Sequence, residues 1–203
     1  MRKIMFNDRY GLTQAVIEGR KTMTRRMISG SPLLPADHIE EVRYFAGFIQ
    51  IVANDGETLL EVKSRYKVGE VVAVAQSYRD VCAGGFEPDA TILRLFEEQR
   101  IAGWTNKMFT KAELMPYQIR ITGIKCERLQ DISDEDCFRE GISESWYEST
   151  DTTTYGYADE KKGTAVEFDT PRKAFATLID KVSGKRMWKS NPWVVVYEFE
   201  LVK

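Results

Sequence analysis

The segment Gly19-Arg20-Lys21-Thr22-Met23-Thr24-Arg25-Arg26 bears most directly on the fold and the chemistry of this chain. It brings four basic side chains and two threonine hydroxyls close together, after a short run that predicts a helix at 9–18. Lysine is a point charge, whereas arginine is a planar fork that suits phosphate or a carbonyl group. Threonine attacks only when a neighbouring base removes its proton. A short basic cluster is most often a solvated turn, so both interpretations stay open at this stage.

Geometry limits what this segment can do. On a regular strand Lys21 and Thr24 would point in opposite directions, because the spacing between them is odd. They can act together only if the backbone bends between them, and Gly19 at the end of the predicted helix favours such a bend. Acid–base chemistry also needs a carboxyl group. Glu140, at the end of a second short predicted helix, is the candidate, although an ordinary surface carboxylate is the simpler interpretation.

The rest of the chain predicts mostly strands. A turn at Asn54-Asp55-Gly56-Glu57 favours a hairpin between two of them. Ser133, with Asp136 three residues later, begins a helix that ends near Gly141. The predicted strands are 45–53, 58–63, 71–76, 116–129 and 193–202, and the other helix is 171–184. Residues 29–32 and the polar segment 143–169 are predicted loops, and the pattern of 82–112 is broken.

These elements predict an α+β fold that is mainly β. Helices and strands do not alternate, which disfavours a parallel sheet with crossover helices. Closure into a small β-barrel would remove exposed strand edges, so we expect a barrel with two to four flanking helices and inserted loops. The 203 residues fit a single domain, 1–203.

Composition excludes several classes of protein. The formal net charge is −2, with 29 basic and 31 acidic residues, so any nucleic-acid site must be a local patch. No apolar run approaches the roughly 20 residues of a membrane span, and the N-terminus has no signal-peptide pattern. The three cysteines have no C-x-x-C spacing and there is one histidine, so we expect no metal site and no cofactor. Reduced thiols favour a cytoplasmic protein.

Four stretches together resemble the ASCH domain, a relative of the PUA RNA-binding domain. They are Gly-Arg-Lys-Thr-x-Thr-x-Arg after a helix, Val-Gly-Glu-Val-Val before a strand, a strand leading to a helix with Glu-Gly, and a final aromatic-aliphatic strand. In this chain they fall at 19–26, 66–74, 117–142 and 193–201. The resemblance implies a PUA-like β-barrel with a cleft beside the basic segment, and binding of RNA or nucleotides.

One small bacterial branch that resembles this sequence hydrolyses the acetyl amide of N(4)-acetylcytidine. Its lysine base, threonine nucleophile and glutamate proton donor correspond to Lys21, Thr24 and Glu140 here. Many other ASCH proteins have an acid where Thr24 stands. That branch is about half as long as this chain, so the resemblance implies insertions near 29–58, 82–113 and 143–169. Long versions with Trp-x-x-Asn-Pro-Trp-Val, here 188–194, are similar to sequences from phages and mobile elements.

Three hypotheses follow. The first is a module that binds RNA, a nucleotide or a modified nucleoside in a cleft lined by 19–26, with substrate contacts from Arg20, Thr22, Arg25 and Arg26. Lys21 and these arginines would take phosphate, and aromatic side chains would stack on bases, the candidates being Tyr78, Trp104 and Trp146.

The second hypothesis is an amidohydrolase that deacetylates N(4)-acetylcytidine or a similar amide. Thr24 is then the nucleophile, Lys21 the base and Glu140 the acid, and Arg26 steadies the oxyanion. Burial and nearby arginine charges would lower the pKa of Lys21, as this role requires. The third hypothesis is a non-catalytic accessory protein of a phage or mobile element.

Overall fold

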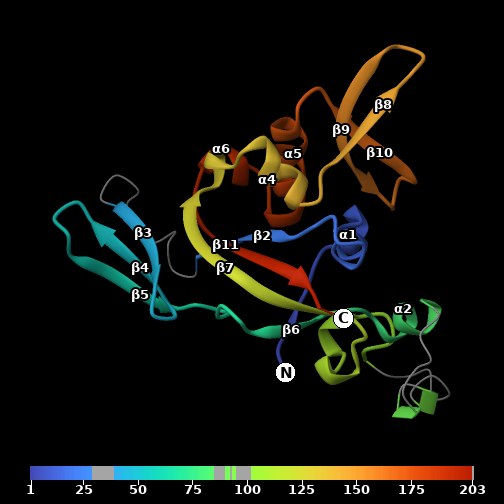
Figure 1. Cartoon of the computed structure of the whole chain (residues 1–203), viewed down its shortest axis with the longest axis horizontal. Coiled ribbons are helices and arrows are strands. Elements are labelled where there is room, and N and C mark those ends of the chain that lie inside the picture. The colour runs from blue at the N-terminus through green and yellow to red at the C-terminus, as the bar shows by residue number, and fades with distance from the viewer. Residues whose placement is uncertain (29–38, 85–89, 92, 95–101, 203) are drawn as a thin grey trace.

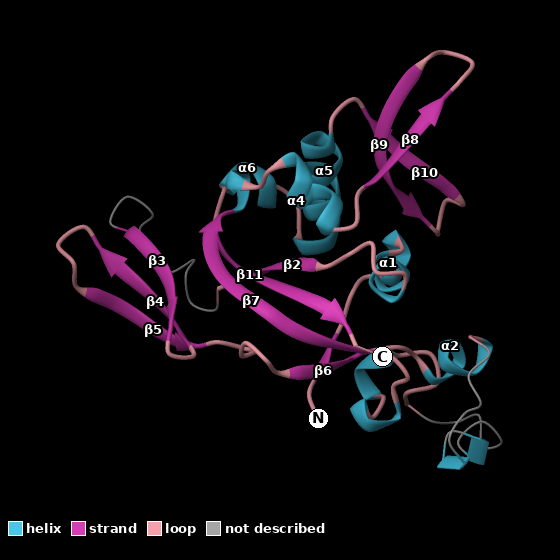
Figure 2. Ribbon diagram, viewed as in Figure 1, coloured by secondary structure: helices cyan, strands magenta, loops and turns pink. Residues whose placement is uncertain are grey.

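The computed structural model describes residues 1–28, 39–84, 90–91, 93–94 and 102–202. The predicted loop at 29–32 lies outside these residues, as do parts of the predicted insertions near 29–58 and 82–113. The described strands form three sheets, one central and two peripheral (Figures 1 and 2). The α+β class, mainly β, is therefore confirmed.

The central sheet has five strands in the order β1-β6-β7-β11-β2. Its two longest strands, β7 and β11, pair antiparallel along their length, and β2 pairs with the other side of β11. Buried valines along β11 explain its place inside the sheet, because a strand that is buried on both faces needs apolar side chains on both. The bounds are β1 Lys3–Ile4, β2 Met23–Met27, β6 Val71–Val74, β7 Gln118–Arg128 and β11 Trp193–Leu201.

The strand pairings of the described residues do not close this sheet into a ring. β1 pairs with β6 and β2 pairs with β11, and each stands at one end of the strand order. Before β2 begins, the Thr22 carbonyl accepts from the Phe199 N–H of β11, whereas the Thr22 N–H donates to the carbonyl of Arg139 in a helix, each at 2.9 Å. The central sheet is thus open in the described part of the chain.

Five helices with defined bounds surround the sheets, one more than the two to four that the sequence predicts. The predicted helix at 9–18 is divided, because Gly11 adopts a left-handed φ of 65° between a 3₁₀ turn and α1. The predicted caps are confirmed: Ser133 accepts from the Asp136 N–H, and Pro171 opens α5. The bounds are α1 Leu12–Ile17, α2 Tyr78–Ala83, α4 Asp134–Arg139, α5 Pro171–Ser183 and α6 Met187–Ser190.

The second sheet contains β3 (Ile39–Phe45), β4 (Phe48–Ala53) and β5 (Thr58–Lys63). The single strand predicted at 45–53 is wrong at its start, because Ala46 and Gly47 have φ values of 50° and 92° and turn the chain into a hairpin. The hairpin predicted around Asn54–Glu57 is confirmed, since β4 and β5 pair antiparallel across it.

The third sheet corrects the loop predicted at 143–169. This segment forms β8 (Ser143–Tyr147), β9 (Thr152–Asp159) and β10 (Thr164–Phe168), which project from the top of the molecule in Figure 1. The polar composition suggested a loop, but the β-branched and aromatic residues among the polar ones suit strands. Tyr157, only 2% exposed, packs edge-on against Tyr10 with ring centroids 5.7 Å apart. The sheet therefore has one covered face, which is sufficient to order it.

No helix of the described residues is long and apolar enough to cross a membrane.

Gly156 tests whether the third sheet is part of the stable structure. A Cβ at this position would overlap the backbone carbonyl of Val166 on β10, so Gly156→Ala must push β9 and β10 apart. We expect Gly156→Ala to lower the free energy of unfolding by about 2 kcal/mol, as overpacking does. Urea denaturation measures this change. Glu144→Ala on the exposed strand β8 is the control and should change stability by less than about 0.5 kcal/mol. Equal, small effects of the two substitutions would support a loop instead.

Candidate functional site

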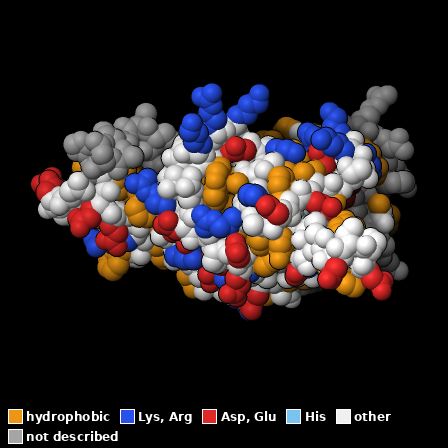
Figure 3. Space-filling model, turned by 90° about the horizontal axis from the view of Figure 1, so that it is seen from above, with side chains coloured by type: hydrophobic (Ala, Val, Ile, Leu, Met, Phe, Trp, Pro, Cys, Tyr) orange, Lys and Arg blue, Asp and Glu red, His pale blue; other side chains and the backbone are white. Residues whose placement is uncertain are grey.

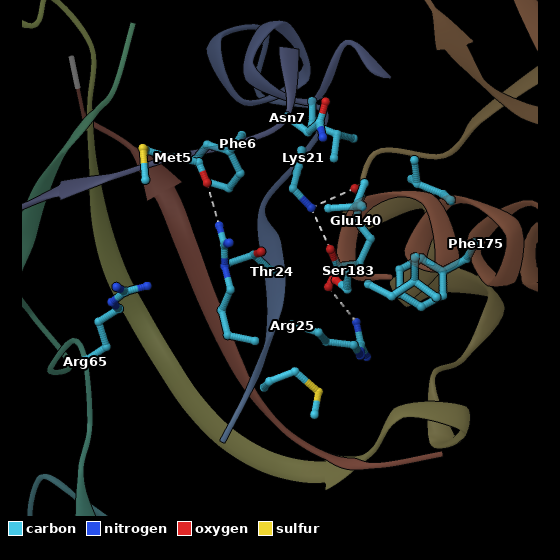
Figure 4. A pocket seen from close by; sticks show the side chains of 16 residues that line it. Met5, Phe6, Asn7, Lys21, Thr24, Arg25, Arg65, Glu140, Phe175 and Ser183 are labelled. Carbon is cyan, nitrogen blue, oxygen red and sulfur yellow. Dashed lines mark hydrogen bonds and ion pairs between the residues drawn. The ribbon is translucent and has the colours of Figure 1, made fainter. Parts of the chain in front are cut away.

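A cavity of about 310 Å³ opens beside the basic segment (Figure 4). Residues before α1, strand β2, the end of α4 and the second half of α5 form its walls. Phe6, Phe175, Leu178 and Ile179 make the apolar part. Lys21, Thr24, Arg25, Arg26, Arg65 and Glu140 make the polar part. A mostly apolar wall with a few polar groups is typical of sites for small organic ligands.

Lys21 and Thr24 line one cavity, which is the condition for them to act together. Gly19 has a φ of 73°, which L-residues rarely adopt, and it ends the helical turn. The Lys21 N–H then donates to the carbonyl of Ala15 at 2.8 Å, and β2 begins two residues later at Met23. Lys21 therefore precedes the strand, and its side chain lines the same cavity as Thr24.

Lys21 and Glu140 form a buried ion pair. The Lys21 Nζ donates to Glu140 Oε2 at 2.6 Å and to the Glu140 carbonyl at 2.7 Å. The two residues are only 2% and 5% exposed. Burial lowers the pKa of Lys21 below its ordinary value, the charge of Glu140 opposes this, and the charges of Arg26 and Arg25 add to it. Lys21 is thus held closer to losing its proton than an exposed lysine is.

Glu140 reaches this position because α4 ends there. Its N–H donates to the carbonyls of Asp136 and Cys137, which continues the last helical turn. The next residue, Gly141, has a φ of 104° and lies against Leu12 of α1, so the chain can leave the helix without a side-chain clash. The carboxylate is therefore aimed into the cavity by the helix end, more than one hundred residues away from Lys21 in the sequence.

Arg25 connects three carboxylates beneath the cavity. It donates to Glu140 Oε1 at 3.1 Å, to Asp136 Oδ2 at 2.9 Å and to Glu127 Oε1 at 2.9 and 2.5 Å. Burial works against its charge, but Glu140 and Glu127 outweigh burial and raise the pKa of Arg25 above its ordinary value. Lys125 also bonds to Glu127, at 2.9 Å. The geometry therefore makes Arg25 part of the protein framework, and its donors already have partners.

Thr24 and Arg26 lie on the other face of β2, because side chains alternate along a strand. No hydrogen bond within the described residues reaches the Thr24 hydroxyl, and Thr24 lines the cavity together with Lys21 (Figure 4). Arg26 donates to the carbonyl of Met5 at 2.6 Å, and its guanidinium lies 5.8 Å from the centroid of the Phe6 ring. These two side chains are better placed to meet a ligand than Arg25 is.

The remaining predicted contact residues do not line this cavity. Arg20 is exposed and pairs with Glu18, and the Thr22 hydroxyl accepts from Arg139 at 3.4 Å. Of the aromatic residues predicted to stack on bases, Tyr78 is buried in a separate apolar cluster against which Trp104 packs. Trp146 is 61% exposed on strand β8, away from the cavity.

The sequence did not indicate several residues that the fold brings to the site. Arg65 follows β5 and lines the cavity opposite Lys21, and Phe175 comes from α5. Asp136 and Glu127 hold Arg25 in place. A hydrophobic period identifies the buried face of α5, but no local pattern shows which element this face meets.

Cysteine chemistry and metal chemistry have little support here. In the part of the chain that the structure describes, no group of three His, Cys, Asp or Glu side chains is arranged to hold a metal ion. The three cysteines are free thiols, and burial raises the pKa of both Cys126 and Cys137 to about 12. Neither thiol is therefore a thiolate nucleophile near neutral pH.

Comparison of the chain with protein-family models, with curated proteins and with solved structures finds no match. The function is therefore argued from the cavity and the residues that line it.

Arg25 provides a test of the framework beneath the site. Arg25→Ala would leave buried carboxylates without their shared partner, and such a loss costs about 3–5 kcal/mol of stability. Urea denaturation at neutral pH measures it. Arg20→Ala, which removes the same charge from the same segment, breaks only an exposed pair and should cost at most about 1 kcal/mol. Equal costs for the two substitutions would contradict the framework role of Arg25.

Proposed function

We propose that this chain is an ASCH-like protein that binds a nucleoside or nucleotide in the cavity beside β2. The observation that carries the proposal is the combination of size and lining. A volume of about 310 Å³ suits a single nucleoside rather than a folded RNA. Phe6 and Phe175 supply apolar surface for a base, and Lys21, Thr24 and Glu140 supply donors and acceptors for its edge.

The surface charge supports a small ligand as well. The face of the molecule in Figure 3 mixes basic and acidic side chains, with apolar patches between them. A protein that binds RNA along a broad surface usually presents one sign of charge there. Local cations at the cavity are therefore the part of the surface that favours nucleotide recognition.

The distribution of the ASCH-like stretches supports the same class. They fall on the bend and β2, on β6, on β7 with α4, and on β11, which all belong to the central sheet or flank it. The described parts of the predicted insertions supply β3, β4 and the third sheet, whereas β5 and α2 lie mostly outside them. We accordingly propose that the central sheet corresponds to a PUA-like barrel, to which these segments are added.

Thr24→Val tests binding without disturbing the framework, because the Thr24 hydroxyl has no hydrogen bond within the described residues. Calorimetry would titrate the protein with N(4)-acetylcytidine, the four ordinary ribonucleosides and a short RNA. We expect at least one nucleoside to bind, and Thr24→Val to weaken its binding about threefold to tenfold, as the loss of one hydrogen bond does.

Thr164→Val, on the exposed strand β10, is the control and should leave binding unchanged. If neither the nucleosides nor the RNA bind at millimolar concentration, the proposal is wrong.

The second candidate is the amidohydrolase, which the Lys21–Glu140 contact favours specifically. A lowered pKa at Lys21 and a hydrogen bond of 2.6 Å to Glu140 allow the proton of Lys21 to move to the carboxylate. Neutral Lys21 would then accept the proton of the Thr24 hydroxyl, and Thr24 Oγ1 would attack the acetyl carbon. Arg26 would stabilise the oxyanion that forms.

The later steps return every group to its starting state. The carbon–nitrogen bond breaks as Glu140 gives its proton to the leaving amine, and an acetyl ester remains on Thr24. The proton of Lys21 then moves to Glu140 again, and water attacks this ester as neutral Lys21 takes the proton of the water. Glu140 returns its proton to Thr24 as acetic acid leaves. The sum is one amide and one water converted to an amine and acetic acid, which releases its proton to solvent as acetate forms. The third hypothesis, a non-catalytic accessory protein, does not require Lys21, Thr24 and Glu140 to lie together.

Release of cytidine from N(4)-acetylcytidine tests the amidohydrolase by chromatography. Lys21→Ala and Thr24→Val should each abolish release, and Thr164→Val should not change it. The rate should fall as the pH rises toward the ordinary lysine pKa of 10.5, because the Lys21–Glu140 pair must keep the proton that the leaving amine receives. Burial lowers the pKa of Lys21, so the fall should begin below that value. Release that matches the Lys21→Ala background would exclude this activity and leave the binding proposal standing.

A further inference from the structure

A second, smaller cavity adjoins the first on the side away from Glu140. Its volume is about 180 Å³, and Arg26, Met27 and Arg65 line both cavities. Lys63, Ser64 and Tyr197 complete its polar lining. In Figure 4, Arg65 is drawn on the far side of Thr24 from Glu140. A ligand in the first cavity therefore has a direct path past Arg26 into the second.

The second cavity has a one-sided charge. Arg26, Lys63 and Arg65 line it, and no carboxylate is among its lining residues in the described part of the chain. Neither Lys63 nor Arg65 has an ion pair with a described carboxylate, and Arg26 donates to the carbonyl of Met5. This differs from the first cavity, where the cations Lys21 and Arg25 already share Glu140.

The positive charges of Arg26 and Arg65 repel each other. Burial lowers the pKa of Arg26, and the charge of Arg65 lowers it further, although Tyr66 and Glu140 act in the opposite direction. An anion between Arg26 and Arg65 would relieve this repulsion. Two guanidinium groups and the Lys63 ammonium group are charged donors, which phosphate oxygens accept from most readily.

The backbone beneath this cavity is fixed by strand β11. The Tyr197 hydroxyl lies 3.1 Å from Ser64 Oγ and accepts from the Arg65 N–H at 3.2 Å. Ser64 Oγ in turn donates to the carbonyl of Tyr66 at 2.7 Å. The main chain of Arg65 is therefore held in place, while its side chain is exposed and faces the cavities. This is the arrangement of a residue that is positioned to meet a ligand.

We propose that the second cavity binds a phosphate group of the ligand whose nucleoside occupies the first cavity. The ligand class is thus a phosphorylated nucleoside, and this inference rests on the proposed function of the first cavity. It also moves the phosphate contacts away from Lys21 and Arg25, because the charges of these two residues are already paired with Glu140, Glu127 and Asp136.

The phosphate group in the second cavity could belong to a mononucleotide or to one nucleotide of an RNA strand. A third cavity, of about 390 Å³, continues from Lys63 and Arg65 and is lined by two more cations, Arg2 and Lys3. A strand would place its next phosphates there, whereas a mononucleotide would not reach it. The experiment therefore compares both kinds of ligand.

Calorimetry would titrate the full chain with cytidine and N(4)-acetylcytidine, with their 5′-monophosphates, with inorganic phosphate, and with a short oligoribonucleotide. We expect each monophosphate to bind about tenfold more tightly than its nucleoside. Arg65→Ala should remove most of this difference, because it should weaken binding of the monophosphate far more than binding of the nucleoside. No hydrogen bond of the Arg65 side chain to a described residue is lost, so the fold should persist.

Arg43→Ala is the matched control, since it removes the same charge from an exposed arginine that pairs with Glu41 on the neighbouring sheet. It should keep the full preference for phosphate. An added loss of oligoribonucleotide affinity in Arg2→Ala, without a loss for the monophosphate, would assign the phosphate to an RNA strand.

The outcomes separate the two proposals. If nucleoside and monophosphate bind equally, the phosphate site is wrong and the nucleoside cavity stands. If inorganic phosphate binds in an Arg65-dependent manner but no nucleoside does, the anion site stands and the proposed function is wrong. If Arg65→Ala and Arg43→Ala weaken the preference for the monophosphate equally, the preference comes from overall charge and not from a site. The phosphate site is then wrong.

Discussion

The buried ion pairs around Glu140 are the constraint on which the rest of the site depends. Glu140 accepts from Lys21 on one oxygen and from Arg25 on the other, and so joins the bend before β2, the strand itself and the end of α4. Charges taken out of water are tolerated only with partners, so a shift of any one of these elements would expose an unpaired charge. The cavity is shaped by this requirement, because its polar wall is the surface of the same network.

Strand β2 divides the basic segment into two functional halves. Alternation turns Arg25 toward Glu127 and Asp136, where it is neutralised, and turns Thr24 and Arg26 toward the other face. Arg65, brought from the segment after β5, faces Arg26 across the two adjoining cavities. The result is a buried, charge-balanced end and an open, positively charged end. A nucleoside with a phosphate has the matching polarity, with neutral base edges at one end and an anion at the other.

Much of the secondary structure could be predicted because its signals are local. Ser133 caps α4, Pro171 opens α5, and the turn after Ala53 joins two strands, as the sequence indicated. The errors arise where contacts between distant segments decide the structure. Residues 143–169 are polar enough to resemble a loop, but contacts such as Tyr157 against Tyr10 and Asp159 with Arg9 hold them as a sheet. The prediction of a closed barrel relied on the general cost of exposed strand edges. Near the start of β2, however, the Thr22 N–H bonds to a helix carbonyl.

The sequence by itself determined that a bend is needed between Lys21 and Thr24 and that Gly19 can provide it, because side-chain alternation and glycine conformation are properties of a short segment. Its resemblance to the ASCH domain also singled out Glu140 as a partner. Only the tertiary structure decided that Arg25 belongs to the framework, that Arg20 and Thr22 lie outside the cavity, and that Arg65 lies opposite Lys21. The physical reason is distance along the chain: Lys21 and Glu140 are 119 residues apart, and only the packing of α4 against the strands sets their contact at 2.6 Å.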